Sequence, residues 1–221
     1  MEIDEAIRER RSIRAYLPEA VPEATIRGLL DVARWSPSWR NTQAWRIWAV
    51  TGQALDDFKE AFTAKLLADA PARPDLDMPG REWPTACMER TARLMETREA
   101  VEAEAGLDAS REGKLRRMGT LFGAPCLLVV GTDASVAQAY AGFDCGVLVQ
   151  TICLAAREQE LGTCIMATAV RFPEVLHDML PGDEGQVFVV GITLGFPDPD
   201  AALNHFPRER AELDEFVTRV S

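Results

Sequence analysis

Three groups of polar residues, far apart along the chain, could act together on one ligand. The first is RRSIR at residues 10–14, the second SPSWRNTQ at 36–43, and the third RER at 208–210. Arginine forks bind phosphate in a bidentate manner, and hydroxyl and amide groups on a turn suit a polyol or the edge of a polar ring. Each group alone is more often a solvated surface. Together they indicate a ligand with a phosphate, a polyol and a polar ring.

Other common catalytic signatures are absent from the sequence. There is no G-x-G-x-x-G, P-loop, H-E-x-x-H or G-x-S-x-G, and no cysteine spacing typical of a metal site, so no metal is expected. The two histidines, His177 and His205, lie in polar surroundings, which argues against a histidine-based triad. Asp144 is the one carboxylate flanked by apolar residues, and we expect a helix cap or a buried hydrogen-bond acceptor there.

Composition limits the class of protein and its partners. The 221 residues suffice for one large domain or two small ones, with the 47% hydrophobic and 27% charged content of an ordinary globular protein. A net charge of -11 argues against non-specific binding to nucleic acid or to an anionic membrane. Five cysteines without close pairing, and no apolar signal segment at the N-terminus, predict a cytoplasmic location.

The segment from about Ala137 to Gln159 is the most apolar helix candidate. Almost every position between Cys145 and Ala156 is apolar or small, so the helix should be buried. It is too short and too interrupted to span a membrane. Small residues at 141, 142, 145 and 146 suit close contact with another helix, so either this chain's own core or a partner subunit could cover it.

Hydrophobic periodicity predicts an α+β fold in which these groups are positioned. Helices are expected at 4–12, 23–35, 53–67, 86–105, 111–122 and 172–180, with an extended tail that ends in a charged helix. Strands are expected at 45–51, 126–132, 164–167 and 186–196. We expect one domain over 1–221, with a helical insertion or lid at about 68–118, where the sequence is least core-like.

In this order, the sequence blocks resemble the FMN-dependent nitroreductase family. They are RRSIRAY, VPEATIRGLLDVARWSPSWRNTQAW, FGAPCLLVV, GFDCGVLVQTICLAARE followed by QELGTCIM, and VVGITLGFPDPDAALNHFPRER. The resemblance covers the chain apart from about residues 68–114. It implies a mixed central β-sheet flanked by helices, in an intertwined homodimer with FMN at each of two interface sites.

The resemblance also implies which residues hold FMN. The phosphate and ribityl end should contact Arg10, Arg11, Ser12, Arg208 and Arg210, the partner chain should supply Pro37, Ser38 and Asn41, and the flavin N5 side should meet the backbone of Met166, Ala167 and Thr168. Arg14 should lie near the pyrimidine edge as an electrostatic stabiliser, and no side chain need be catalytic. Arg117 is a looser match, and Trp39, which departs from the family pattern, could wall the site or point into the dimer core.

The implied reaction is ping-pong hydride transfer from NADH or NADPH to a small acceptor such as a nitroaromatic compound or a quinone. Two alternatives stay open. One is a specialised enzyme of the same fold, such as a dehalogenase, a desaturase or a flavin-modifying enzyme, whose lid over residues 83–118 would engage the substrate. The other is a flavin-binding protein without turnover.

Overall fold

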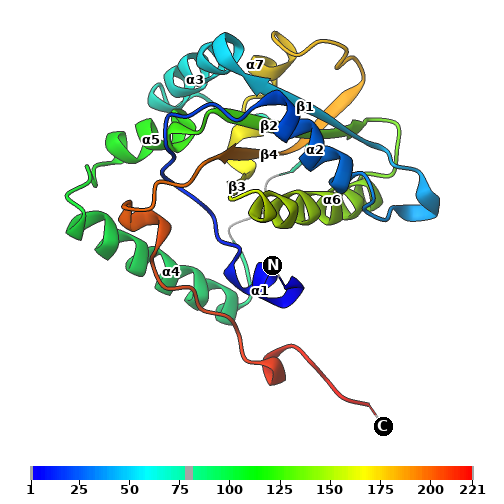
Figure 1. Cartoon of the computed structure of the whole chain (residues 1–221). Coiled ribbons are helices and arrows are strands. Elements are labelled where there is room, and N and C mark those ends of the chain that lie inside the picture. Colours follow the sequence, from blue (N-terminus) through cyan, green and yellow to red (C-terminus); the bar gives the residue numbers. More distant parts are fainter. Residues whose placement is uncertain (1, 78–81, 221) are drawn as a thin grey trace.

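A computed structural model describes residues 2–77 and 82–220, and its centre is a single four-stranded sheet (Figure 1). The strands lie in the order β1-β2-β4-β3, and each neighbouring pair is antiparallel. Their bounds are β1 Trp45–Thr51, β2 Cys126–Asp133, β3 Gly162–Met166 and β4 Gln186–Gly195. The parallel component of the expected mixed sheet is confined, in the described residues, to one isolated bridge between Ser12 and Thr163.

Helices cover both faces of this sheet, and strand β2 shows why its sequence is continuously apolar. Successive side chains of a strand point to opposite faces. Leu127 and Val129 pack with α3 (Gly52–Leu67) and α7 (Pro173–His177) on one face. Cys126, Leu128 and Val130 pack on the other face with the two helices there, α2 (Glu23–Ala33) and α6 (Gln138–Glu158). The α+β architecture expected from the sequence is therefore confirmed.

Helix α6 is buried along one face only. Leu148, Ile152 and Cys153 pack against the sheet, whereas Tyr140 and Phe143 on the other face are 61% and 70% exposed. Of the helices in the described ranges, α6 alone has the length and apolar composition of a membrane span, with 44% of that window buried. The sequence left open whether this chain's own core or a partner subunit covers the helix, and the core covers only one of its faces.

The segment between α3 and β2 contains two helices, α4 (Thr85–Glu104) and α5 (Arg111–Gly119). Ser110 caps α5 by accepting a hydrogen bond from the Gly113 N–H at 3.0 Å, and α5 packs on α3. Helix α4 buries only Glu102 and contacts the short helix η4 (Ala202–Asn204) instead of the sheet. Its role as a lid stays a prediction.

Several of the expected helix and strand boundaries are wrong. Helix α1 (Ile3–Glu9) ends before residues 10–12, because Ser12 bridges to Thr163 and the chain there is extended. The charged helix expected in the tail is reduced to one short turn, η5 (Leu213–Glu215). The apolar side chains at helical spacing there, Leu213, Phe216, Val217 and Val220, stay exposed, so packing does not stabilise a longer helix. Helix α5 and strand β3 also end earlier than expected, at Gly119 and Met166.

Candidate functional site

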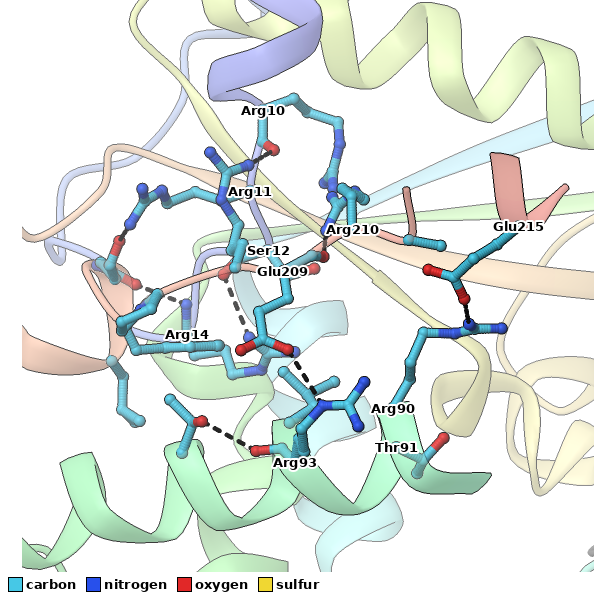
Figure 2. A pocket seen from close by; sticks show the side chains of 18 residues that line it. Arg10, Arg11, Ser12, Arg14, Arg90, Thr91, Arg93, Glu209, Arg210 and Glu215 are labelled. Atoms are coloured by element: carbon cyan, nitrogen blue, oxygen red, sulfur yellow. Dashed lines mark hydrogen bonds and ion pairs between the residues drawn. The ribbon is translucent and has the colours of Figure 1, made fainter. Parts of the chain in front are cut away.

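A cavity of about 350 Å³ lies between the N-terminal segment, helix α4 and the C-terminal tail (Figure 2). Residues 10–14 and 208–210 both line it, although they are almost 200 positions apart in the sequence. Figure 2 shows the side chains of both segments converging above α4. Six predicted cofactor-binding residues are therefore brought together, namely Arg10, Arg11, Ser12, Arg14, Arg208 and Arg210.

A buried asparagine holds the two segments in place. Asn204 Oδ1 accepts the backbone N–H of Arg14 at 2.8 Å, and its Nδ2 donates to the carbonyls of Ala15 at 2.8 Å and Asp198 at 2.9 Å. The Asn204 carbonyl also accepts from Arg11 Nη1 at 2.6 Å. Asn204 uses both amide hydrogens in this way, and it holds the N-terminal segment and the tail together along one wall of the cavity.

The cavity is strongly cationic. The lining comprises seven arginines, Arg10, Arg11, Arg14, Arg90, Arg93, Arg208 and Arg210, against two glutamates, Glu209 and Glu215. Burial lowers the pKa of Arg208, and the charges of Arg11, Arg210, Arg10 and Arg157 lower it further. Burial likewise lowers the pKa of Arg14. Cations that destabilise one another in this way are stabilised by an anionic ligand.

Arg208 also links the tail to the start of the chain. Its guanidinium donates to the backbone carbonyl of Arg10 and, at 2.7 Å, to that of Arg8. These two carbonyls hold the Arg208 guanidinium at the C-terminal end of α1. A phosphate bound there would meet arginines from both termini, which suits the phosphate end of FMN.

The second predicted group lies elsewhere on the molecule. Pro37, Ser38 and Asn41 do not line the cavity, and their loop is attached to α6 by the Trp39 N–H, which donates to Asp144 at 3.0 and 3.2 Å. Asp144 is therefore the buried acceptor, one of the two roles expected for it.

The loop and the cavity are attached to different ends of α6. Arg157, near the C-terminal end, forms an ion pair of 2.6 Å with Glu9, directly before the cationic segment. Asp144 is 13 residues earlier, about 20 Å along the helix at 1.5 Å per residue. One chain therefore holds the two groups at opposite ends of α6, as Figure 1 also shows.

The residues expected beside the flavin N5 lie where β3 ends. Met166 is the last residue of the strand, and Ala167 and Thr168 begin the short helix η3 (Ala167–Val170). Gly191 on β4 lets this segment approach closely, because a Cβ at that position would lie 2.6 Å from the Ala169 Cβ. Ser12 bridges to Thr163 of β3, so the arginine-rich segment at 10–14 and residues 166–168 lie at the same edge of the sheet.

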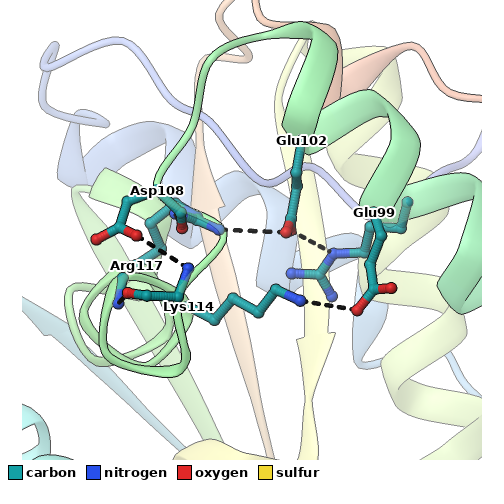
Figure 3. Close-up of polar contacts among 8 residues, drawn as sticks. Glu99, Glu102, Asp108, Lys114 and Arg117 are labelled. Carbon is teal, nitrogen blue, oxygen red and sulfur yellow. Dashed lines mark hydrogen bonds and ion pairs between the residues drawn. The ribbon is translucent and has the colours of Figure 1, made fainter.

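Arg117 does not belong to the cationic cavity. Its Nη1 donates to the Asp108 carbonyl at 2.7 Å, and its Nη2 lies 3.3 Å from Glu102 Oε2, within an ion network that joins α4 to α5 (Figure 3). It lines a neighbouring hollow of about 600 Å³, which Arg14 also lines. The loose match of Arg117 to a flavin contact stays a prediction.

Sequence reasoning missed Asn204, Arg90 and Arg93. The two arginines lie on α4, where their spacing resembles an ordinary solvated helix face, and Asn204 lies in a polar tail. Only the pairing of distant segments reveals them.

Comparison with known proteins agrees with this geometry. Residues 7–196 match the model of the nitroreductase family. A 4-nitrobenzoate reductase from Pseudomonas putida is 31% identical over 96% of this chain and 93% of its own, and a chloronitrobenzene nitroreductase from Comamonas testosteroni is 32% identical over 99% and 96%. The FMN-dependent nitroreductase NfnB from Mycobacterium smegmatis, solved in complex with NADPH, superposes with a TM-score of 0.88 at 28% identity, covering 99% and 97% of the two chains. The chain belongs to the nitroreductase family.

Proposed function

We propose that this chain is an FMN-dependent oxidoreductase that takes a hydride from NADH or NADPH and reduces nitroaromatic or related small acceptors. The observation that carries the proposal is the cavity in which arginines from both termini meet beside Ser12. Two relatives, 31% and 32% identical to this chain, are named for the reduction of nitroaromatic compounds. A cytoplasmic enzyme is consistent with five free cysteines, four of them buried.

The residues present fit FMN. Five residues would hold its phosphate, namely Arg10, Arg11, Ser12, Arg208 and Arg210. Burial and the neighbouring arginines lower the pKa of Arg208, and a bound dianion stabilises its charged form. When bound, FMN supplies the centre that accepts a hydride from the nicotinamide donor and delivers it to the acceptor in a second half-reaction. The work of the protein is to bind and orient, with Arg14 as a positive charge beside the ring.

The complete site would require two copies of the chain. Pro37, Ser38 and Asn41 lie too far from the cavity of their own chain to share one FMN with it. A second copy packed on the open face of α6, next to Tyr140 and Phe143, would bury that apolar surface and bring its own loop to the first cavity. The helix is also open at Gly142 and Gly146, where an added Cβ would meet nothing within 4 Å.

Absorption spectroscopy tests the activity. The purified protein should be yellow, and NADH or NADPH should bleach it under anaerobic conditions. A yellow protein that neither donor bleaches would favour a non-turnover flavin-binding protein or a specialised enzyme with another reductant. A colourless protein that takes up no added FMN would refute the proposal.

Substitution tests the phosphate assignment. Arg10→Ala combined with Arg208→Ala should weaken FMN binding by about 100-fold or more, since each charge-assisted hydrogen bond is worth roughly 1.5–3 kcal/mol. Arg116→Ala is the matched control, because Arg116 pairs with the exposed Glu112 on α5 and lies outside the cavity. Unchanged FMN affinity in the double variant would show that the phosphate lies elsewhere.

A separate variant tests the dimer. Phe143→Glu places a charge on the open face of α6 and should yield a monomer that has lost most of its FMN affinity. Analytical ultracentrifugation gives the mass, and fluorescence titration gives the affinity. A dimer with normal FMN binding would exclude this face as the interface.

A further inference from the structure

The cationic cavity contains more positive charge than the phosphate of FMN can balance. Seven arginines and two glutamates among its described lining residues leave five net positive charges. A phosphate monoester carries about −1.5 to −2 charges at neutral pH. About three positive charges therefore stay uncompensated when FMN is bound, enough for a second dianion.

Two of the seven arginines form a pair of their own on one wall of the cavity, where each faces a glutamate of the tail. Arg90 and Arg93 are three residues apart on α4, so their side chains leave the same face of the helix, and Thr97 continues that face along the cavity. In Figure 2 both arginines rise from α4 on the wall opposite Arg10 and Arg11. They come from the part of the chain that matches the family blocks least and form a cationic pair distinct from the predicted FMN set.

The C-terminal tail divides these two cationic walls. Residues 208–210 form no helix or strand, and neighbouring side chains there reach different walls of the cavity. Arg208 reaches back to the carbonyl of Arg10, while Glu209 between the two tail arginines reaches Arg93 on α4, 3.3 Å from its Nε. Anions could therefore bind on either side of the tail.

The pairs that Arg90 and Arg93 now make are exchangeable. Arg90 Nη1 lies 3.0 Å from Glu215 Oε2, and both carboxylates come from the tail. The two glutamate side chains are 49% and 72% exposed. Ion pairs with such exposure contribute little, because solvent screens them and the side chains lose entropy. A ligand dianion can replace the two carboxylates charge for charge.

We propose that Arg90 and Arg93 form a second anion site that binds the 2′-phosphate of NADPH in place of Glu209 and Glu215. The enzyme then prefers NADPH to NADH, because NADH leaves both arginines on the tail carboxylates. A single carboxylate on an acceptor would balance only one of the two arginines, so the phosphate is the better match. The donor preference rests on the proposed function, whereas the anion site itself does not.

Calorimetric titration with adenosine 2′-phosphate tests the site without any turnover. The FMN-loaded protein should bind it more tightly than adenosine 5′-phosphate. Arg90→Gln combined with Arg93→Gln should weaken this binding by about 10- to 100-fold, since both partners of a charge-assisted contact are lost. Arg116→Gln, which removes the same charge outside the cavity, should leave it unchanged.

Anaerobic flavin reduction gives the second readout. In the Arg90→Gln/Arg93→Gln variant, the dissociation constant for NADPH should rise by the same factor, while that for NADH changes less than about 3-fold. Glu209→Gln combined with Glu215→Gln should lower the dissociation constant for NADPH, because the competing carboxylates are gone. Rising ionic strength should reduce the NADPH preference of the wild type.

Three outcomes would overturn the assignment. Loss of FMN from the Arg90→Gln/Arg93→Gln variant would place both arginines in the FMN site. Equal weakening of NADPH and NADH would remove the 2′-phosphate from the contact. If the variant bound both donors as the wild type does but reduced 4-nitrobenzoate less well than nitrobenzene, the two arginines would instead bind the carboxylate of an acceptor. A wild type that binds adenosine 2′-phosphate but holds no flavin would refute the proposed function alone.

Discussion

Replacing Glu102 by glutamine should loosen the α4 helix that carries Arg90 and Arg93. Glu102 is only 1% exposed, its Oε1 accepts from Arg98 Nε at 3.0 Å, and its Oε2 lies 3.3 Å from Arg117 Nη2. It is the buried charge of the two that link α4 to α5, whereas Glu99, which pairs with Lys114, is exposed (Figure 3). Glutamine keeps the shape and one acceptor but leaves two arginine heads without a counter-charge.

The loss of stability follows from the burial of the partners. Removing one member of a buried ion pair destabilises proteins by about 3–5 kcal/mol. Arg98 and Arg117 keep 22% and 20% of their side-chain surface, so water can reach them and the lower end applies. We expect Glu102→Gln to lose about 3 kcal/mol of unfolding free energy, or roughly 6–12 °C in Tm for a chain of this length.

Urea unfolding followed by tryptophan fluorescence measures this loss. Wild type and variant are compared at equal protein and saturating FMN concentrations, because ligand and partner binding shift apparent stability. Glu99→Gln is the control, since Glu99 pairs with Lys114 beside the network but is exposed, and its urea midpoint should not move. Equal midpoints for the Glu102 and Glu99 variants would show that Glu102 is not the tie between the helices.

Variants at four further positions test the core and the site. Burial raises the pKa of Cys126 from 9.0 to about 12, so wild-type stability should fall between pH 9 and about 12 more than that of Cys126→Ala, as read from urea midpoints. Gly191→Ala, whose Cβ would meet a core methyl at 2.6 Å, should lose about 1–3 kcal/mol. Gly28→Ala, facing open space on α2, should gain about 0.5–1 kcal/mol in the same assay. Asp144→Ala frees the loop at 38–43 and should lower FMN affinity by about 10-fold in a fluorescence titration, while Asp144→Asn keeps an acceptor and should lose less.

Elements with a strong local pattern could be predicted from the sequence. Strand β1 has the expected bounds, Trp45–Thr51, and α2 differs only at its C-terminal end, because their burial patterns repeat with the period of the element. The end of α1 could not be predicted, because it depends on a bridge to Thr163, some 150 residues away. The helix predicted in the tail does not form for the opposite reason, since residues there have good helix propensity but nothing to pack against.

The residue types that form the site could be predicted from the sequence, but the way in which distant segments come together could not. The arginines at 10–14 and 208–210 were expected to share one ligand because both segments carry forks, and the structure places them in one cavity. No local pattern indicates that α4 supplies a second pair, or that Asn204 joins the two termini. Both depend on how distant segments meet, and so does any role for the loop at 36–43.

That loop is held in a strained conformation before any ligand binds. Arg40, Asn41 and Gln43 have φ between 48° and 58°, a region that costs non-glycine residues of order 1 kcal/mol or more each. The strain persists because α6 holds Trp39, through Asp144 and through a ring contact with Tyr140 at 6.2 Å between centroids. Since Trp39 is anchored on α6 within its own chain, it does not need a partner to order it. In the proposed two-chain site, the entropy of ordering the loop is therefore lost when the chain folds and not when FMN binds. Helix α6 both shapes the loop and presents the apolar face on which the second copy would pack.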